Sequence, residues 1–425
     1  MEKIFADLIE RLKAEPNQAQ GLMLMAEAAF ESAGYREQVP VGVEDILVVR
    51  LDAVGDMILT SGFLRELRAN YPYARITLVC SPLARPVVEL CPYVNEVLTF
   101  DKDSLDRNFP AMFETIVGFC KEHLWQRHFS MAFSPQWGTD NLPGLLMAYL
   151  SGARERIGYG VNPYASWGAE ASPEVAVRDN FLLTNNIIAP REAVAEIEKH
   201  FYVLSAVGLA INKDNTELFF DAADFLRAQE MLQVIPPNCK RVVLGIGAGF
   251  GSRQYPVDKL VVALKALAAK DLCFVIVGGQ AEVADANFIE QSLPSGKVLN
   301  LAGKTTLRET EAVIGQADYY IGNDSGVMHM AATAQLPCVV IYREAQDKED
   351  FLPGALSEYR RFPPWQTQSV ILRPDHQLEE CAKRPPIYGW CHHAEAHCIT
   401  QIPPSQVVEA FEALESLEQG DGAQG

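Results

Sequence analysis

Short apolar runs alternate with helix-like patterns from Asp45 onward, and this alternation constrains the fold more than any other feature of the chain. The run Ile46-Leu47-Val48-Val49 precedes a stretch, 57–70, in which apolar residues recur at helical spacing. Apolar runs of this length are typical of strands that are buried on both faces, as parallel strands are when crossover helices cover them. The sequence therefore predicts an α/β protein built on parallel sheets.

The alternation is interrupted by polar stretches at 211–216 and 236–240 and then restarts. Strands are expected at 46–49, 75–80, 94–100, 131–134, 241–246, 272–277, 319–321 and 338–342. Helices are expected at 57–70, 191–209, 256–269, 281–291, 307–316 and 327–334. We therefore expect two Rossmann-like domains in tandem, and open sheets of this kind bind ligands beyond the carboxyl ends of their strands.

The expected domain bounds follow from these patterns. An N-terminal domain spans 45–212 and a C-terminal domain spans 213–402. A helical extension over 1–44, a packing or oligomerisation element, precedes them, and a C-terminal helix with a frayed tail covers 403–425. The cleft between the two domains is the expected place of function.

The charge and the cysteines exclude several classes of protein. Lys and Arg number 36 against 55 Asp and Glu, a formal net charge of −19, so the chain is not expected to bind nucleic acid through its overall charge. Its apolar runs fall short of the roughly 18 residues of a membrane span, and its start lacks the pattern of a signal peptide. Nine cysteines in 425 residues are too sparse for a disulfide scaffold. We expect a cytoplasmic protein.

The first loop that can carry chemistry joins the first strand to the first helix, Arg50-Leu51-Asp52-Ala53-Val54-Gly55-Asp56. Gly55 allows a tight turn and a close approach to a ligand. Asp56 stands where the helix begins, so its carboxylate is either an N-cap or a reactive group. Asp52 is a short polar residue whose side chain is expected to stabilise the loop.

The second loop, 245–256, carries glycines at four alternate positions and then Arg253. The glycines include Gly247 and Gly249, and their exposed N–H groups are suited to hold a phosphate beside the guanidinium. The loop is not the dinucleotide fingerprint G-x-G-x-x-G, which would need glycine at Phe250 or at Ser252.

The third loop leads from a strand into a helix through Asn323-Asp324-Ser325-Gly326-Val327-Met328-His329. The first-turn N–H groups and the positive end of the helix dipole make such a turn a pyrophosphate site. The same local sequence also fits a capped helix with a buried histidine and no ligand. A fourth turn, Val277-Gly278-Gly279-Gln280-Ala281-Glu282, places a carboxylate where it can accept the hydroxyls of a ribose or simply stabilise the helix dipole.

Taken together, these loops resemble those of glycosyltransferase family 9, the heptosyltransferases that build the inner core of lipopolysaccharide. The resemblance covers Asp45 to about Ala413 and rests on five motifs: Arg50-Leu51-Asp52-x-x-Gly55-Asp56, the glycine-rich loop ending Arg253-Gln254-Tyr255-Pro256, Gly278-Gly279-x-x-Glu282, Leu301-Ala302-Gly303-Lys304-Thr305, and Asn323-Asp324-Ser325-Gly326-x-Met328-His329-x-Ala331.

The resemblance implies a GT-B fold and an inverting, metal-independent transfer from a nucleotide-sugar, most readily ADP-heptose, with no cofactor. It makes Asp56 the general base, assisted at the leaving group by Arg253, and it places the acceptor, a glycan or glycolipid, beside Asp52 and Gly55. It makes Glu282 the ribose ligand. It assigns the remaining donor contacts to Gly247, Gly249, Asp324, Ser325, Gly326, Val327, Met328 and His329. Peripheral contact with the inner face of the inner membrane is implied with a lipid-linked acceptor.

Two positions depart from the family pattern. Arg253-Gln254-Tyr255-Pro256 stands where the family usually has Lys, a polar or basic residue, then Trp-Pro, so the charge is kept and its geometry altered. Val327 replaces the usual proline, which pre-sets a helix start, so the turn is expected to be less rigid.

Cysteines and histidines crowd into 381–398. Cys381, Cys391, His397 and Cys398 form a candidate structural metal site, and a reduced loop without metal is the alternative. The sequence also leaves two other functions open: a nucleotide-sugar epimerase or hydrolase of the same fold, and a non-catalytic scaffold that binds sugar nucleotides.

Overall fold

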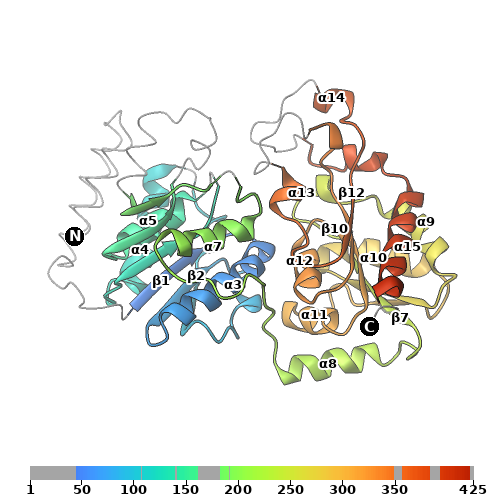
Figure 1. Ribbon diagram of the computed structural model, residues 1–425, viewed down its shortest axis with the longest axis horizontal. Coiled ribbons are helices and arrows are strands. Elements are labelled where there is room, and N and C mark those ends of the chain that lie inside the picture. The colour runs from blue at the N-terminus through green and yellow to red at the C-terminus, as the bar shows by residue number, and fades with distance from the viewer. Residues whose placement is uncertain are drawn as a thin grey trace. The chain divides into compact units, whose positions relative to one another are not determined.

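The structure is a computed structural model that describes residues 45–106, 108–138, 141–160, 182–190, 192–348, 357–382 and 393–421 (Figure 1). The extension expected over 1–44 lies outside these residues. The described chain forms two compact units. The first holds the described residues up to Ala53 together with Thr60–Asp214, and the second holds Val54–Leu59 and the residues from Asn215 onward.

The first unit is built on a six-stranded sheet in the order β3-β2-β1-β4-β5-β6, with every neighbouring pair parallel. Its strands are β1 (Asp45–Arg50), β2 (Arg75–Cys80), β3 (Glu96–Thr99), β4 (Met131–Ser134), β5 (Glu155–Tyr159) and β6 (Asn185–Ile187). Its helices are α4 (Phe109–His123), α5 (Leu142–Leu150) and α7 (Glu196–Ala206), the short 3₁₀ helix η2 (Arg85–Val87), and α3 (Val54–Asn70) from Thr60 onward, since Val54–Leu59 group with the second unit.

The second unit repeats this plan with the order β12-β11-β10-β7-β8-β9, again all parallel. Its strands are β7 (Lys240–Gly245), β8 (Leu272–Val277), β9 (Val298–Asn300), β10 (Tyr319–Asn323), β11 (Cys338–Ile341) and β12 (Ser369–Leu372). Its α-helices are α8 (Ala222–Leu232), α9 (Val257–Leu267), α10 (Val283–Ser292), α11 (Leu307–Ile314), α12 (Gly326–Thr333), α13 (Glu358–Arg361), α14 (Glu379–Ala382) and α15 (Pro404–Asp421). Its 3₁₀ helices are η4 (Gly251–Arg253), η5 (Gln280–Glu282), η6 (Gln346–Lys348) and η9 (Cys398–Gln401). Helices α11 and α12 lie on one side of this sheet, and α9 and α15 on the other (Figure 1).

Burial explains why these segments adopt these structures. In β1, Ile46, Leu47 and Val48 have no exposed surface, as expected for a central parallel strand with helices on both faces. In α3 the inward positions Phe63, Leu64 and Leu67 are likewise fully buried. The helix ends at Asn70, just before Tyr71-Pro72, because the residue before a proline disfavours helical geometry.

The two-sheet α/β prediction is confirmed, and eight strands lie where apolar runs predicted them. The helix expected over 191–209 begins later, at Glu196, where the Glu198 carboxylate accepts the amide of Ala195 at 2.8 Å. Strands β5, β6, β9 and β12 were not predicted, nor was α8. The tail expected to fray is helical through Asp421. Among the described residues, no helix is long and apolar enough to cross a membrane.

Candidate functional site

Three loops of the second unit leave the same edge of its sheet. They follow β7, β8 and β10, which are neighbours in the order β10-β7-β8. The chain runs from β7 to β8 in one direction along the sheet and from β10 to β11 in the other. The carboxyl ends of β7 and β10 therefore form a topological switch point, where open α/β sheets bind ligands. We call residues 245–256, 278–282 and 321–329 the three-loop site.

Glu282 joins two of these loops. Its Oε2 accepts the amide of Gly279 at 2.7 Å, and a Cβ added at Gly247 would lie 2.7 Å from its Oε1. A Cβ at Gly278 would lie 3.0 Å from the Glu282 Cβ. A side chain at position 247 would therefore have to displace the Glu282 carboxylate, which occupies that space. The structure brings Gly247 and Glu282 together, while Gly249 is exposed with no atom within 4 Å of an added Cβ.

Asn323 ties the glycine-rich loop to the end of β10. Its Nδ2 donates to the carbonyl of Ile246 at 2.7 Å, and its Oδ1 accepts the amide of Tyr255 at 3.0 Å. The Tyr255 hydroxyl in turn donates to the carbonyl of Ile402 at 2.9 Å. Sequence reasoning assigned no role to Asn323. The sequence did offer a signal for this role, namely an asparagine directly before Asp324. Its side-chain amide can both donate and accept hydrogen bonds, so it can connect two loops.

Arg253 is a half-buried residue in a charge cluster whose other members are Asp324, Arg343 and Glu358. Its Nη1 is 3.4 Å from Asp324 Oδ2, and its Nη2 is 3.3 Å from Glu358 Oε1. Arg343 donates through Nε to Glu358 Oε2 at 2.9 Å and through Nη1 to Ser252 Oγ. Although burial opposes it, the Glu358 and Asp324 carboxylates raise the pKa of Arg253. The guanidinium is thus held charged beside the glycine-rich loop.

Burial shifts the pKa values of Asp324 and His329 in opposite directions, because in both residues it disfavours the charged form. It raises the pKa of Asp324 to about 6, against the opposing effect of Arg253. It lowers the pKa of His329 to about 4, and the positive charge of Arg253 adds to the lowering. His329 is therefore a neutral imidazole at neutral pH. Within the described chain, Arg253 Nε and His329 Nδ1 are buried and make no hydrogen bond, while Asp324 Oδ2 makes no hydrogen bond but is ion-paired with Arg253.

The helix α12 begins at this cluster. Ser325 is its N-cap residue in extended geometry, and the Ser325 side chain makes no capping hydrogen bond to the first turn. The amides of Gly326, Val327 and Met328 have no intrahelical partner by position, and they carry the positive end of the helix dipole. Met328 is fully buried and anchors the turn. This helix start can bind an anion.

The buried histidine predicts a pH dependence of stability. A folded-state pKa of about 4 for His329, against 6.5 for a free imidazole, means that the unfolded chain binds the proton first as pH falls. The free energy of unfolding should drop by about 1 kcal/mol between pH 7 and about pH 5.5 through this residue alone. Denaturant unfolding of the wild type and of His329→Asn at both pH values measures it. Equal pH dependence of the two proteins would remove His329 as the cause.

The residues predicted for the acceptor side lie in the loop from β1 to α3 and in the first turn of α3. Asp52 forms ion pairs with Arg50 at 3.2 Å and with Lys102 at 2.7 Å, and its carbonyl accepts the Ser81 hydroxyl at 2.9 Å. Asp52 therefore stabilises the loop through ion pairs. Gly55 and Asp56 lie in the first turn of α3, where Gly55 is buried and Asp56 is half-buried.

One interpretation of Asp56 is wrong. The N-cap residue of α3 is Ala53, so Asp56 is not the N-cap of this helix. It lies inside the first turn, where a carboxylate interacts favourably with the helix dipole. Asp56 also lies near the carboxyl end of β1, where open α/β sheets bind ligands, and this position is compatible with the other interpretation, that Asp56 is a reactive group.

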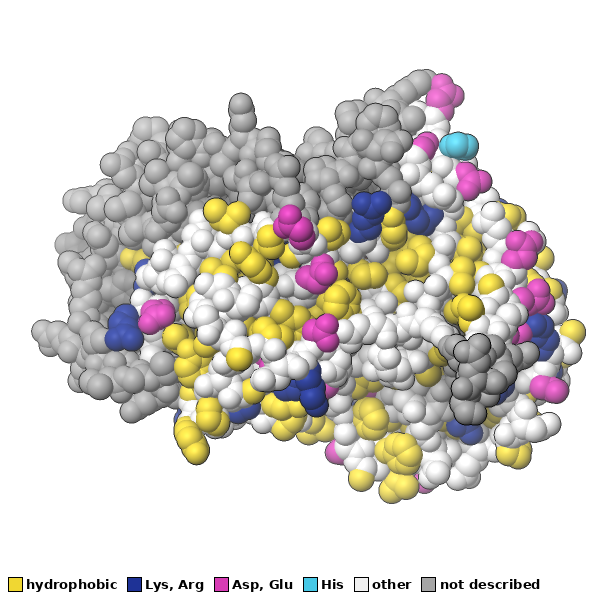
Figure 2. Space-filling view, viewed as in Figure 1, with side chains coloured by type: hydrophobic (Ala, Val, Ile, Leu, Met, Phe, Trp, Pro, Cys, Tyr) yellow, Lys and Arg dark blue, Asp and Glu magenta, His cyan; other side chains and the backbone are white. Residues whose placement is uncertain are grey.

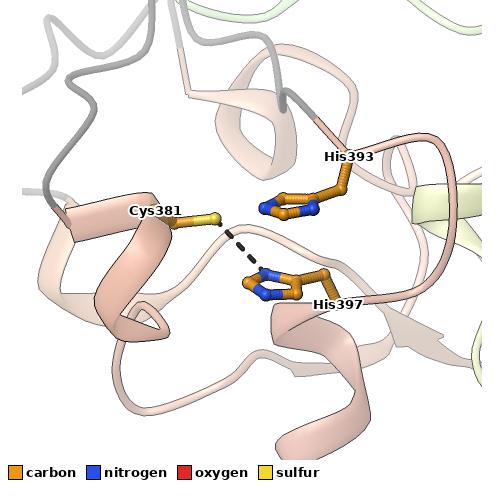
Figure 3. Close-up of side chains that lie close together, drawn as sticks. All are labelled: Cys381, His393 and His397. Carbon is orange, nitrogen blue, oxygen red and sulfur yellow. Dashed lines mark hydrogen bonds between the residues drawn. The ribbon is translucent and has the colours of Figure 1, made fainter.

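The structure brings together part of the candidate metal site that was predicted within 381–398 (Figure 3). Cys381 and His397 approach each other, with Cys398 beside them, while Cys391 lies outside the described residues. His393, which the predicted set omitted, also lies in this cluster. The contacts of Arg343 with Glu358 and of Arg373 with Glu344, at 3.4 Å, were not predicted either.

Comparison with solved structures shows which fold this is. The chain is similar to a glycosyl transferase of family 9 from Veillonella parvula, with a TM-score of 0.66 and 18% identity over 89% of this chain and 99% of that one. It is similar to the Escherichia coli ADP-heptose lipopolysaccharide heptosyltransferase II, with a TM-score of 0.62 and 18% identity over 88% and 99%. These likenesses confirm the GT-B fold.

Sequence comparison identifies the family. Lipopolysaccharide heptosyltransferase 2 of Salmonella typhimurium is 24% identical over 402 residues, 88% of this chain and 99% of that protein. Lipopolysaccharide heptosyltransferase 3 of Escherichia coli is 23% identical over 291 residues, 68% and 80%. The model of glycosyltransferase family 9 (heptosyltransferase) matches residues 167–390, more than half of the chain. The chain belongs to glycosyltransferase family 9.

Proposed function

We propose that this glycosyltransferase moves a heptose from ADP-heptose to a hydroxyl of a lipopolysaccharide-core or related glycan, with inversion at the anomeric carbon and without a metal ion. The three-loop site is the observation that carries the proposal. It combines a charged guanidinium, a helix start and glycine backbone at the switch point of the second sheet. The structural relatives include the ADP-heptose enzyme of Escherichia coli, and this supports the choice of donor.

The departing diphosphate is stabilised by Arg253 and the amides that begin α12. Both are fixed before the reaction, Arg253 by Asp324 and Glu358, and the helix start by buried Met328. Preorganised donors of this kind stabilise developing charge without reorganisation. His329 is neutral at neutral pH, so it contributes hydrogen bonding and shape rather than charge.

The nucleotide is bound where Glu282 packs against Gly247. A carboxylate there accepts the ribose hydroxyls, and the glycine backbone lets the nucleotide approach closely. The Glu282 carboxylate is already oriented by the Gly279 amide at 2.7 Å.

Asp56 is the general base in this proposal. An inverting displacement needs a base on the acceptor hydroxyl and charge stabilisation at the leaving group, on opposite sides of the anomeric carbon. The β1 to α3 loop, with Gly55 and Asp52, provides the acceptor side. Asp52 holds this loop through Arg50 and Lys102.

A lipid-linked acceptor would bring the protein to the inner face of the inner membrane as a peripheral enzyme of the cytoplasm. The net charge of −19 opposes a general attraction to an anionic surface. On the face shown in Figure 2, the Lys and Arg side chains of the described residues stand in small separate groups. Membrane contact would therefore depend on local pairs of basic residues such as Arg360 and Arg361.

We also propose that the chain self-associates through residues 1–44.

The proposed nucleotide site is tested by Gly247→Ala. The added Cβ meets the Glu282 carboxylate at 2.7 Å and must displace it. Losing hydrogen bonds from a charged group costs about 1.5–3 kcal/mol, so affinity for ADP should fall by about ten- to hundredfold. Calorimetric titration of ADP, GDP and UDP measures this and ranks the bases.

The matched control is Gly279→Ala. Its Cβ would lie 3.5 Å from Glu282 Oε2, an ordinary contact, so it should keep the affinity for ADP. Equal affinities of wild type and Gly247→Ala would contradict the assigned ribose site. Absence of binding by all three nucleotides would contradict the proposed function itself.

A further inference from the structure

Arg343 and Glu344 follow the carboxyl end of β11 and contact the charge cluster that contains Arg253. Both residues are buried, with exposed fractions of 8% and 4%. Strand β11 is the parallel neighbour of β10, so its carboxyl end lies at the same edge of the sheet as the three-loop site. Burying a charge is costly unless partners hold it. The partners of Arg343 and Glu344 therefore show what these two charges hold in place.

Arg343 binds the carboxylate of Glu358 with two nitrogens of its guanidinium. Its Nε donates to Glu358 Oε2 at 2.9 Å, and its Nη2 donates to Glu358 Oε1. Such a bidentate pair fixes the orientation of the carboxylate as well as its position. The third nitrogen, Nη1, donates to Ser252 Oγ. One planar side chain thus connects α13, which begins at Glu358, to η4, which contains Ser252.

These two partners of Arg343 are also neighbours of Arg253. Glu358 Oε1 lies 3.3 Å from Arg253 Nη2, and Ser252 directly precedes Arg253 in η4. Arg343 therefore acts on Arg253 in two ways, through the backbone before it and through its ion-pair partner. The positive charge of Arg343 also partly neutralises Glu358, so Arg253 is attracted less strongly to this carboxylate and keeps more of its charge for an anionic ligand.

Glu344 fixes the backbone from which the Glu358 side chain projects. Its Oε1 accepts the hydroxyl of Ser357 at 2.6 Å, and its Oε2 accepts the amide of Glu358. Arg373 holds Glu344 in turn, with Nη2 3.4 Å from Oε1 and with Nε donating to the Glu344 carbonyl at 3.0 Å. Helix α13 has only four residues, too few to be stable alone, so these contacts determine where it lies.

The orientation of Arg253 matters for the proposed reaction because the departing diphosphate must find a positive charge already in place. A preorganised donor stabilises developing charge without a cost of reorganisation. Arginine has a long side chain with several rotatable bonds, so an Arg253 without fixed neighbours would have to be ordered in every catalytic cycle. A misplacement of about 1 Å can reduce a rate by about 10²-fold. The contacts of Arg343 are therefore expected to affect the rate of transfer.

We propose that Arg343 is a positioning residue for sugar transfer, which orients Arg253 toward the departing diphosphate. It does so through the Glu358 carboxylate and the Ser252 hydroxyl, and Glu344 supports the arrangement by holding the start of α13. The inference rests on the proposed function, because Arg343 affects the reaction only through Arg253. Its effect should therefore disappear when Arg253 is absent.

The test is a cycle of four proteins: the wild type, Arg343→Met, Arg253→Ala and the double variant. Their kcat values are measured with saturating ADP-heptose by mass spectrometry of the glycan. In the wild-type background, Arg343→Met should lower kcat by about ten- to hundredfold. In the Arg253→Ala background, the same change should lower kcat by less than about twofold, because the residue that Arg343 orients is already gone.

A purely structural role of Arg343 would give a different result. General damage to the second unit would slow both backgrounds by the same factor, and equal falls would overturn the proposal. The matched control is Arg241→Met, which removes a guanidinium that donates to the Gln316 carbonyl at 2.9 Å at the start of β7. This control should keep the wild-type kcat. Equal losses in Arg343→Met and Arg241→Met would also overturn the proposal.

Arg343→Lys keeps the experiment decisive if methionine prevents folding. Lysine preserves the charge but cannot bind Glu358 and Ser252 together as a planar fork, so kcat should fall between those of the wild type and Arg343→Met. Its loss should again disappear in the Arg253→Ala background. A folded Arg343→Lys with the wild-type kcat would overturn positioning by the guanidinium.

Failure of this inference differs from failure of the proposed function. An active wild type with equal losses in both backgrounds would remove the role of Arg343 alone. A wild type that transfers no sugar would contradict the proposed function and, with it, any role of Arg343 in the reaction.

Discussion

Replacement of Asp56 by asparagine should slow sugar transfer by about 10²–10⁴ and leave ADP affinity unchanged. The amide keeps the size of the side chain and its place in the first turn of α3, but it cannot take a proton from the acceptor hydroxyl. The leaving-group contacts belong to other elements, β7, β10 and α12 with their loops, so the nucleotide should still bind. Transfer is followed by mass spectrometry of the glycan and binding by calorimetry.

Asp56→Glu is the matched variant for this prediction. It keeps the carboxylate and moves it by one methylene, so it should recover part of the rate that asparagine loses. Transfer by Asp56→Asn at the wild-type rate would remove Asp56 from the role of base. A parallel loss of rate and ADP affinity would instead assign Asp56 to the nucleotide site.

Arg253→Ala should lower transfer by about 10²–10³ and also destabilise the second unit. Arg253 is the cation between Asp324 and Glu358, at 3.4 Å and 3.3 Å. Without it, Asp324 is a buried carboxylate that has lost its partner, a change that costs about 3–5 kcal/mol when the carboxylate stays charged. The pKa of Asp324, already raised to about 6 by burial, should rise further, so the variant should regain stability as pH falls.

A double variant separates the two effects of Arg253. In Arg253→Ala with Asp324→Asn the buried charge is gone, so the stability should recover while the rate stays low. Arg253→Lys keeps the charge but cannot bridge both carboxylates as a planar fork, so it should fall between the wild type and alanine. Recovery of the rate together with the stability would show that Arg253 acts on the fold alone.

The fold was predictable wherever burial leaves a continuous apolar run. Strands β1 and β8 consist of such runs because helices cover both their faces. Strand β6 has the sequence Asn-Asn-Ile and lies at the edge of its sheet, so no apolar run marks it. The start of α7 was misplaced for a related reason, since a side-chain contact from Glu198, and not a change of pattern, begins the helix.

The site was predictable where its residues are adjacent in sequence. Each of the loops that contain Gly247, Glu282 and Ser325 shows its own pattern of glycine and helix start. The sequence pattern did not predict the ion pair of Arg253 with Glu358, because Glu358 is 105 residues away and only the fold brings the two side chains close. The contacts of Asn323 with Ile246 and Tyr255 likewise join separate segments, which local spacing does not encode.

The most direct test of the central claim is transfer itself, measured by mass spectrometry on lipopolysaccharide-core acceptors that lack heptose. With ADP-heptose, the wild type should add the mass of one heptose to the acceptor, and Asp56→Asn should not do so under the same conditions. Cleavage or isomerisation of ADP-heptose with no new glycan on any of these acceptors would contradict the account.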